Sequence, residues 1–141
     1  MRDDEGFLWF ATIDGLNRYN GYEIKIYYNH PGPRSLPGNI INALHNLQPP
    51  QGGQLWVGTE NNGLCRYNPI QDNFITLSGD SQALPSPTVQ ALHGKYPFLW
   101  VGTDNGLARL DVRSMHIRKP QDSLPGLHNS SITALAPTAD G

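Results

Sequence analysis

The sequence has 141 residues, a length typical of one domain, and its formal net charge of −2 gives no electrostatic reason to expect nucleic acid as a partner. One cysteine, Cys65, excludes an intrachain disulfide, and the apolar runs fall far short of the roughly 20 residues that cross a membrane. We therefore expect no direct membrane contact from this segment. The acidic residues 1–5 lack the apolar core of a signal peptide, so none is expected here.

Taken in chain order, the short apolar and alternating segments predict twelve strands. Asx-Gly dipeptides at 14–15 and 105–106 predict tight hairpins, because both residue types tolerate positive φ. The loop at 29–38 is too rich in proline for a helix, and the acidic run 3–5 is interpreted as a solvated turn. The strands are expected near residues 7–12, 15–20, 22–27, 39–46, 54–60, 63–68, 73–77, 88–93, 98–103, 106–111, 115–119 and 131–136.

One stretch recurs along the chain. Residues 55–64 return as 99–107 and, in degraded form, as 8–16, and the tryptophans at 9, 56 and 100 are 47 and 44 residues apart. A fixed period of this length marks a repeat architecture, and four antiparallel strands per period make the blade of a β-propeller. A helical repeat of similar period is the alternative, which the prolines and the Asx-Gly hairpins disfavour.

The predicted fold is therefore all-β, a partial β-propeller of about three four-stranded antiparallel blades. We expect a single propeller fragment over 1–141, with repeats near 1–38, 39–86 and 87–128, and with 129–141 starting a further blade. Trp56 and Trp100 are predicted to be largely buried between consecutive sheets. Gly58 and Gly102 lie inside strand patterns, where glycine marks a bulge or a close approach by another backbone.

Residues that could carry chemistry mostly follow the repeat. Arginines 18, 66 and 109 share one position and suggest either a ligand-binding ladder or, as we favour, one structural contact per blade. His45 and His93 could form half of a metal site, but polar residues closing a strand are the simpler interpretation. Cys65 fills a small-residue position and is expected to be inert. No catalytic residue, metal site or cofactor is predicted.

Residues 53–59 with 63–68 resemble the two-component regulator propeller repeat, and so does 99–111 with its preceding strand. The resemblance covers almost the whole chain in three copies. It implies the sensor region of a bacterial membrane histidine kinase, often a hybrid one, located in the periplasm or otherwise outside the inner membrane. The implied partners are the remaining blades of a longer parent chain and a small molecule or glycan. Ala11 departs from the usual glycine, and residues 94–98 replace the usual acidic-Gly turn.

Three functions are compatible with a propeller, because the fold alone decides none of them. A non-catalytic sensory, ligand-binding segment is favoured; a protein-interaction scaffold and a fragment of a propeller lyase or hydrolase are the alternatives. The polar residues obey the repeat, which disfavours the enzyme. The loops before the inner strands are the candidate ligand site, since loops on a rigid scaffold carry function. They contain Arg34, Ser35, Asn39, Ser86, Thr88, Asn129 and Ser130.

The number of blades raises a further expectation. Three blades cannot close a ring, because propellers have about 4–8 blades. The chain is then either a fragment of a longer propeller, which we favour, or one half of a six-bladed dimer in which each chain lends its last strand to the other.

Overall fold

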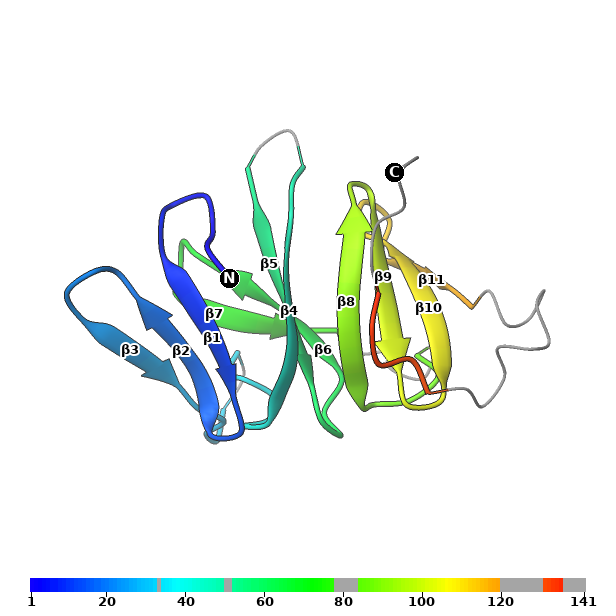
Figure 1. Ribbon diagram of the computed structural model, residues 1–141, viewed down its shortest axis with the longest axis horizontal. Coiled ribbons are helices and arrows are strands. Elements are labelled where there is room, and N and C mark those ends of the chain that lie inside the picture. The colour runs from blue at the N-terminus through cyan, green and yellow to red at the C-terminus, as the bar shows by residue number, and fades with distance from the viewer. Residues whose placement is uncertain (33, 50–51, 78–83, 120–130, 136–141) are drawn as a thin grey trace.

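The computed structural model describes residues 1–32, 34–49, 52–77, 84–119 and 131–135. In this part of the chain there are eleven strands in three antiparallel sheets and no helix, so the predicted all-β fold is confirmed (Figure 1). None of the described residues forms a helix long and apolar enough to cross a membrane.

The three sheets are the predicted blades. Blade 1 has the order β1-β2-β3, blade 2 β4-β5-β6-β7, and blade 3 β8-β9-β10-β11. Their bounds are β1 Leu8–Thr12, β2 Gly15–Tyr19, β3 Ile24–Tyr27, β4 Ile41–Leu47, β5 Gln54–Thr59, β6 Leu64–Asn68, β7 Asn73–Thr76, β8 Val89–Lys95, β9 Phe98–Thr103, β10 Gly106–Asp111 and β11 His116–Arg118.

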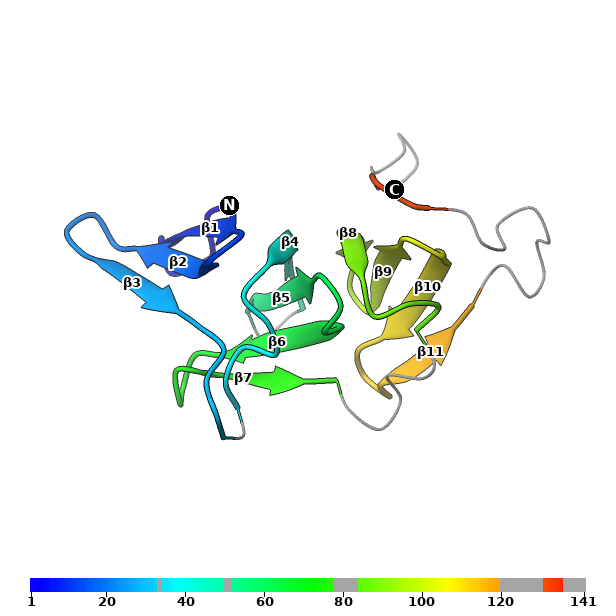
Figure 2. The same ribbon diagram turned by 90° about the horizontal axis from the view of Figure 1, so that it is seen from below.

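The blades lie side by side around one edge. Seen from below, β1, β4 and β8 line this inner edge, and each sheet runs outward from it (Figure 2). Strand β1 contacts β4, and β4 contacts β8. Because each blade is covered by the next, two hydrophobic cores form between sheets rather than one core inside a sheet.

The first core lies between blades 1 and 2 and the second between blades 2 and 3. Trp9 belongs to the first and Trp56 to the second, and each side chain is 1% exposed. Trp56 is thus buried as predicted. Trp100 is only half-buried, which corrects the prediction for that residue, because the described residues place no complete sheet against its side of blade 3.

The repeated hairpins close with the same contact in every blade. The hydroxyls of Thr12, Thr59 and Thr103 donate to the carbonyl oxygens of Gly15, Gly63 and Gly106 at 2.6, 2.8 and 2.8 Å. These glycines have φ of 103°, 79° and 123°, the left-handed region that the Asx-Gly signal predicted.

Close packing between blades occurs at the glycines inside the strands. A Cβ added at Gly58 would lie 3.0 Å from Cβ of Val89, and one added at Gly102 would lie 2.6 Å from Cγ2 of Ile132. A β-branched residue near the start of each following inner segment therefore sits on the glycine of the preceding blade. A close approach is present at both glycines, but at Gly58 a side chain makes it rather than the backbone that was predicted.

The segment 131–136 is not the strand that was predicted, because its described part, 131–135, forms no strand. The backbone N–H of Ile132 nevertheless donates to the carbonyl oxygen of Thr103 at 2.7 Å. An inner strand needs the tryptophan strand of its own blade as a ladder partner, and no such strand lies beside it among the described residues. Whether 129–141 starts a further blade stays a prediction.

Candidate functional site

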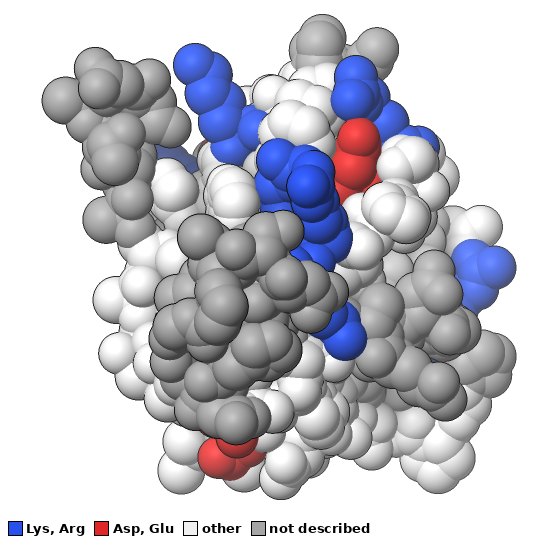
Figure 3. All heavy atoms as spheres, turned by 90° about the vertical axis from the view of Figure 1, so that its right-hand side faces the viewer, with Lys and Arg blue, Asp and Glu red and all other residues white. Residues whose placement is uncertain are grey.

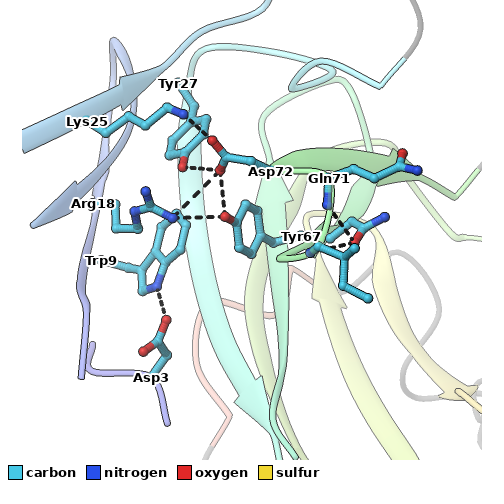
Figure 4. A network of polar contacts seen from close by, with 10 residues as sticks. Asp3, Trp9, Arg18, Lys25, Tyr27, Tyr67, Gln71 and Asp72 are labelled. Carbon is cyan, nitrogen blue, oxygen red and sulfur yellow. Dashed lines mark hydrogen bonds and ion pairs between the residues drawn. The ribbon is translucent and has the colours of Figure 1, made fainter. Parts of the chain in front are cut away.

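One carboxylate gathers polar side chains from two blades. Asp72 lies in the turn between β6 and β7, and its carboxylate accepts hydrogen bonds from the hydroxyls of Tyr27 and Tyr67, each at 2.6 Å (Figure 4). Its second oxygen pairs with the ammonium group of Lys25, and the guanidinium of Arg18 lies at 3.7 Å. Strands β2 and β3 of blade 1 thus meet a turn of blade 2 at a single acidic residue.

The environment of Asp72 keeps it ionised. Burial opposes the charged form, but hydrogen bonds from Lys25, Tyr27 and Tyr67 outweigh it and lower the pKa of Asp72 to about 2. Burial, followed by the hydrogen bond to Asp72, raises the pKa of Tyr27 well above its ordinary value. Both tyrosines are therefore neutral donors to a charged acceptor, an arrangement that makes short, strong hydrogen bonds.

An open groove lies beside this network. Its two parts measure about 450 and 480 Å³ and lie between β3, the loop after it and β7. The shared lining residues include His30, Arg34 and Ser35, and Lys25 and Asp72 border one part. The groove thus has the nitrogen-bearing side chains of Lys25, His30 and Arg34, and its one carboxylate, Asp72, already has its charge paired. This composition suits an anionic or polyhydroxylated ligand.

Arg34 is fixed at the groove by its backbone. It has φ of 69°, its carbonyl oxygen accepts the N–H of Phe74 at 3.0 Å, and its guanidinium donates to Oε1 of Gln71 at 2.9 Å. The hydroxyl of Ser35 donates to the carbonyl oxygen of His30 at 2.9 Å. The structure thus brings Arg34 and Ser35 of the predicted site together.

The other predicted residues hold loops in place. Oδ1 of Asn39 accepts the N–H of Asn29 at 2.6 Å, which ties the two ends of the groove loop. Oγ of Ser86 accepts the N–H of Thr88 at 3.1 Å, and the Thr88 hydroxyl bonds to Asn61. Neither Ser86 nor Thr88 lines the groove. Asn129 and Ser130 lie outside the described residues, and the ligand site as a whole stays a prediction.

The three arginines of the repeat make the structural contact that was favoured. In each blade the arginine is directly opposite the tryptophan across the hairpin. The guanidinium carbons of Arg18, Arg66 and Arg109 each lie 5.8 Å from the centroid of that tryptophan ring. Cation–π packing against the tryptophan ring of the same blade explains why the arginine recurs without any ligand.

The two histidines of the inner strands lie together at the junction of blades 2 and 3. Their ring centroids are 5.1 Å apart, and Nε2 of His45 is 3.1 Å from the carbonyl oxygen of Gly94. Burial, with a smaller effect of His93, lowers the pKa of His45. Among the described residues no group of three His, Cys, Asp or Glu side chains could hold a metal ion. Cys65 is fully buried, and burial raises the pKa of its thiol.

The acidic run near the N-terminus forms the exposed turn that was predicted at Asp4 and Glu5, and its aspartates also make specific contacts. Oδ2 of Asp3 accepts the indole N–H of Trp9 at 2.7 Å. Asp4 reaches blade 2, where it accepts the backbone N–H of Gly53 at 2.8 Å and the side-chain amide of Gln48 at 2.7 Å. These carboxylates fix the entry to blade 1 and tie it to the β4–β5 hairpin.

Sequence reasoning missed Lys25, His30 and Asp72. The signal that could have found Asp72 is its position in the repeat. Asp72 is the residue just before the outer strand of blade 2, and the equivalent residue of blade 3 is Met115. A charged residue at a position that is apolar in the next repeat breaks the repeat, and such a break marks a local function.

The fold is similar to those of solved extracellular domains of signalling proteins. The extracellular domain of the putative hybrid two-component system BT3049 from B. thetaiotaomicron matches with a TM-score of 0.78 and 28% identity, covering 93% of this chain and 19% of that one. The extracellular domain of the putative one-component system BT4673 from the same organism matches with a TM-score of 0.78 and 24% identity, covering 100% and 18%. A second structure of BT4673, described there as a hybrid two-component system, has a TM-score of 0.61 and 21% identity.

No protein-family model and no curated protein matches the chain. The chain spans about a fifth of the length of the first two structures that it matches. The likeness at 28% identity supports a sensory role in general and a location outside the cytoplasm.

Proposed function

We propose that the chain is a segment of the extracytoplasmic sensor propeller of a two-component signalling receptor, with a histidine kinase as its output. The observation that carries the proposal is the likeness over 93% of the chain, at 28% identity, to the extracellular domain of a hybrid two-component system. In support of a binding rather than a catalytic role, the repeated arginines pack on tryptophan rings and the carboxylate of Asp72 is engaged by several donors.

Within this role, the groove beside Arg34 is the proposed ligand site. Its basic rim favours an acidic ligand, and the hydroxyl and amide groups around it suit a sugar. We therefore propose an acidic oligosaccharide as the class of ligand. A guanidinium binds a carboxylate through two parallel hydrogen bonds, which makes Arg34 the main anchor of the site.

The test is calorimetric titration of the purified chain with tetragalacturonate, with neutral maltotetraose as the control ligand. We expect binding of the acidic sugar to weaken about tenfold in Arg34→Ala, and to be lost when Asn39→Ala also releases the groove loop. Arg113→Ala, which removes an exposed arginine from blade 3, is the matched control and should bind normally. Equal binding of the acidic sugar by all variants would place the ligand on another surface.

In the intact receptor, the same ligand should change autophosphorylation of the kinase, and Arg34→Ala should remove that response. A response to the ligand that survives the substitution would separate the sensory role from this groove.

A further inference from the structure

Blade 3 presents a pair of arginines on the face that carries Trp100. Arg109 is directly opposite Arg118 across β10 and β11, and opposite Trp100 across β9 and β10. Its guanidinium lies 4.3 Å from the ring centroid of Phe98. Figure 3 shows Lys and Arg side chains gathered on the visible face of this end of the molecule. We propose that this face binds a further blade of the same repeat through a carboxylate in the turn before that blade's outer strand.

The junction of blades 1 and 2 is the template for this contact. There Arg18 is directly opposite Lys25, so two cations share one face of blade 1. Asp72 of blade 2 pairs with both. It is the residue just before β7, and its φ of 55° in the left-handed region turns its side chain toward blade 1 (Figure 4).

The junction of blades 2 and 3 replaces this charge contact with an apolar one. The residue opposite Arg66 is Ile75, so only one cation is present. The residue just before β11 is Met115, which has φ of 59° and packs against the core between blades 2 and 3. The same turn position thus carries a carboxylate at the junction where the preceding blade presents two cations. It carries a thioether at the junction where the preceding blade presents one cation and an isoleucine.

If two cations on one blade are matched by a carboxylate on the next, Arg109 and Arg118 should be paired by a carboxylate of the following blade. Like charges directly opposite on a sheet repel, and one carboxylate between two guanidiniums relieves the repulsion. Neither arginine makes an ion pair with another described residue, and the nearby Asp111 pairs with Arg113 at 3.1 Å.

The following segment already lies at this face. Ile132 sits on Gly102 as Val89 sits on Gly58, so 131–135 takes the place of an inner strand of a further blade. A blade continued from there would bring its outer turn to Arg109 and Arg118. This step rests on the proposed function, in which the chain belongs to a longer propeller.

The first experiment adds a further blade. The chain is extended after Gly141 by a copy of residues 54–77, so that Gly141 takes the place of Gly53 before the tryptophan strand. Two versions keep the copied Asp72 or replace it by Met. We expect the version with Asp to unfold at a higher urea concentration, and Arg118→Ile to reverse the order. In the chain that keeps Arg118, equal unfolding midpoints for the two versions, or a higher midpoint for the version with Met, would overturn the proposal.

The second experiment needs no added blade. Ile75→Arg and Met115→Asp rebuild the two-arginine and carboxylate arrangement at the existing junction of blades 2 and 3. In a double-mutant cycle, we expect the ratio of folded to unfolded double variant to exceed the value expected from the single variants about fivefold. If the effects of the two single substitutions simply combine without coupling, the pairing rule is overturned. This result holds even if the appended blade of the first experiment fails to dock.

Light scattering on the unmodified chain tests whether a second copy of the chain, rather than a following blade, binds this face. If the chain dimerises and Arg118→Ile abolishes the dimer, the face binds a second copy, and the assignment to a following blade is wrong. These experiments measure unfolding and molecular mass, so a failure of sugar binding would leave their results unchanged. The proposed sugar site and the proposed blade contact can therefore fail separately.

Discussion

At the scale of single residues, the groups that join the blades are charged residues with several partners. Asp72 accepts from two tyrosines and pairs with two cations, while Asp4 accepts from three groups of the β4–β5 hairpin. Such contacts lie at the edges of the two apolar cores. They therefore fix which turn meets which strand, while burial of the apolar side chains of the two cores supplies most of the stabilisation.

The stability of the chain should depend on pH through Asp72. Its pKa is about 2, below the ordinary 3.8, so its contribution is present above pH 3.8 and is lost as pH falls through about 2. Because the side chain is 33% exposed, screening reduces this contribution to about 1 kcal/mol. Urea unfolding of the native chain and of Asp72→Asn between pH 2 and pH 7 measures it.

The two unfolding curves for Asp72 should converge at the acid end of that range. Glu60→Gln removes an exposed carboxylate and is the control, with an expected change below about 0.5 kcal/mol at pH 7. A constant difference between the native chain and Asp72→Asn at every pH would show that the loss is steric rather than electrostatic.

Little of the candidate site could be predicted from the sequence. Arg34 and Ser35 were found because the proline-rich loop precedes an inner strand. Lys25 and Asp72 are 47 residues apart, and no local pattern joins them. Their meeting depends on how blade 2 docks on blade 1, which is set by Trp9 and the aromatic cluster around it rather than by either charge.

At the scale of strands and sheets, the repeat predicted nearly everything. Period-two alternation and Asx-Gly turns located eleven strands, with small shifts at the ends such as β3, which begins at Ile24 because Asn20 caps the preceding turn. The failure at 131–136 has the opposite cause. A strand is defined by its partner, and local sequence cannot tell whether the partner is present.

The glycine inside β5 should be required for docking of blade 3. In Gly58→Ala the new methyl group would press on Val89, so overpacking should cost about 1–3 kcal/mol of unfolding free energy. Val89→Ala makes room, and the double variant should show favourable coupling. Chemical unfolding of the four proteins measures the cycle, and purely additive losses would mean that the two side chains do not meet.

Truncation of the tryptophans should follow their burial. Trp56→Ala should cost about 3–5 kcal/mol, the value for a buried aromatic residue, and Trp100→Ala clearly less because its ring is only half-buried. Thermal melts followed by circular dichroism compare them, with Tyr22→Ala, 93% exposed, as the control. Equal losses for both tryptophans would show that the outer face of blade 3 is covered in solution.

At the scale of the whole molecule, the two ends of the array differ in chemistry. Blade 3 ends in a cationic face around Arg109, whereas the outer face of blade 1 is apolar. Phe10, Ile24 and Ile26 lie on that face and are 48%, 64% and 45% exposed. In the register of β1, β2 and β3 they share one side of the sheet, opposite to Trp9 and Tyr27. A contiguous apolar sheet face of this kind is a surface for association.

We therefore expect the purified chain to self-associate through blade 1. Burial of apolar area drives such contacts, so the apparent mass in light scattering should rise with concentration and with sulfate, which strengthens the hydrophobic effect. Ile24→Lys with Ile26→Lys should keep the chain monomeric, because two charges on the patch oppose burial. Ile70→Lys changes an isoleucine that is 93% exposed in a turn of blade 2, and it should leave association unchanged. Equal association of both variants would place the contact elsewhere, and loss of association in Arg118→Ile alone would move it to the cationic face of blade 3.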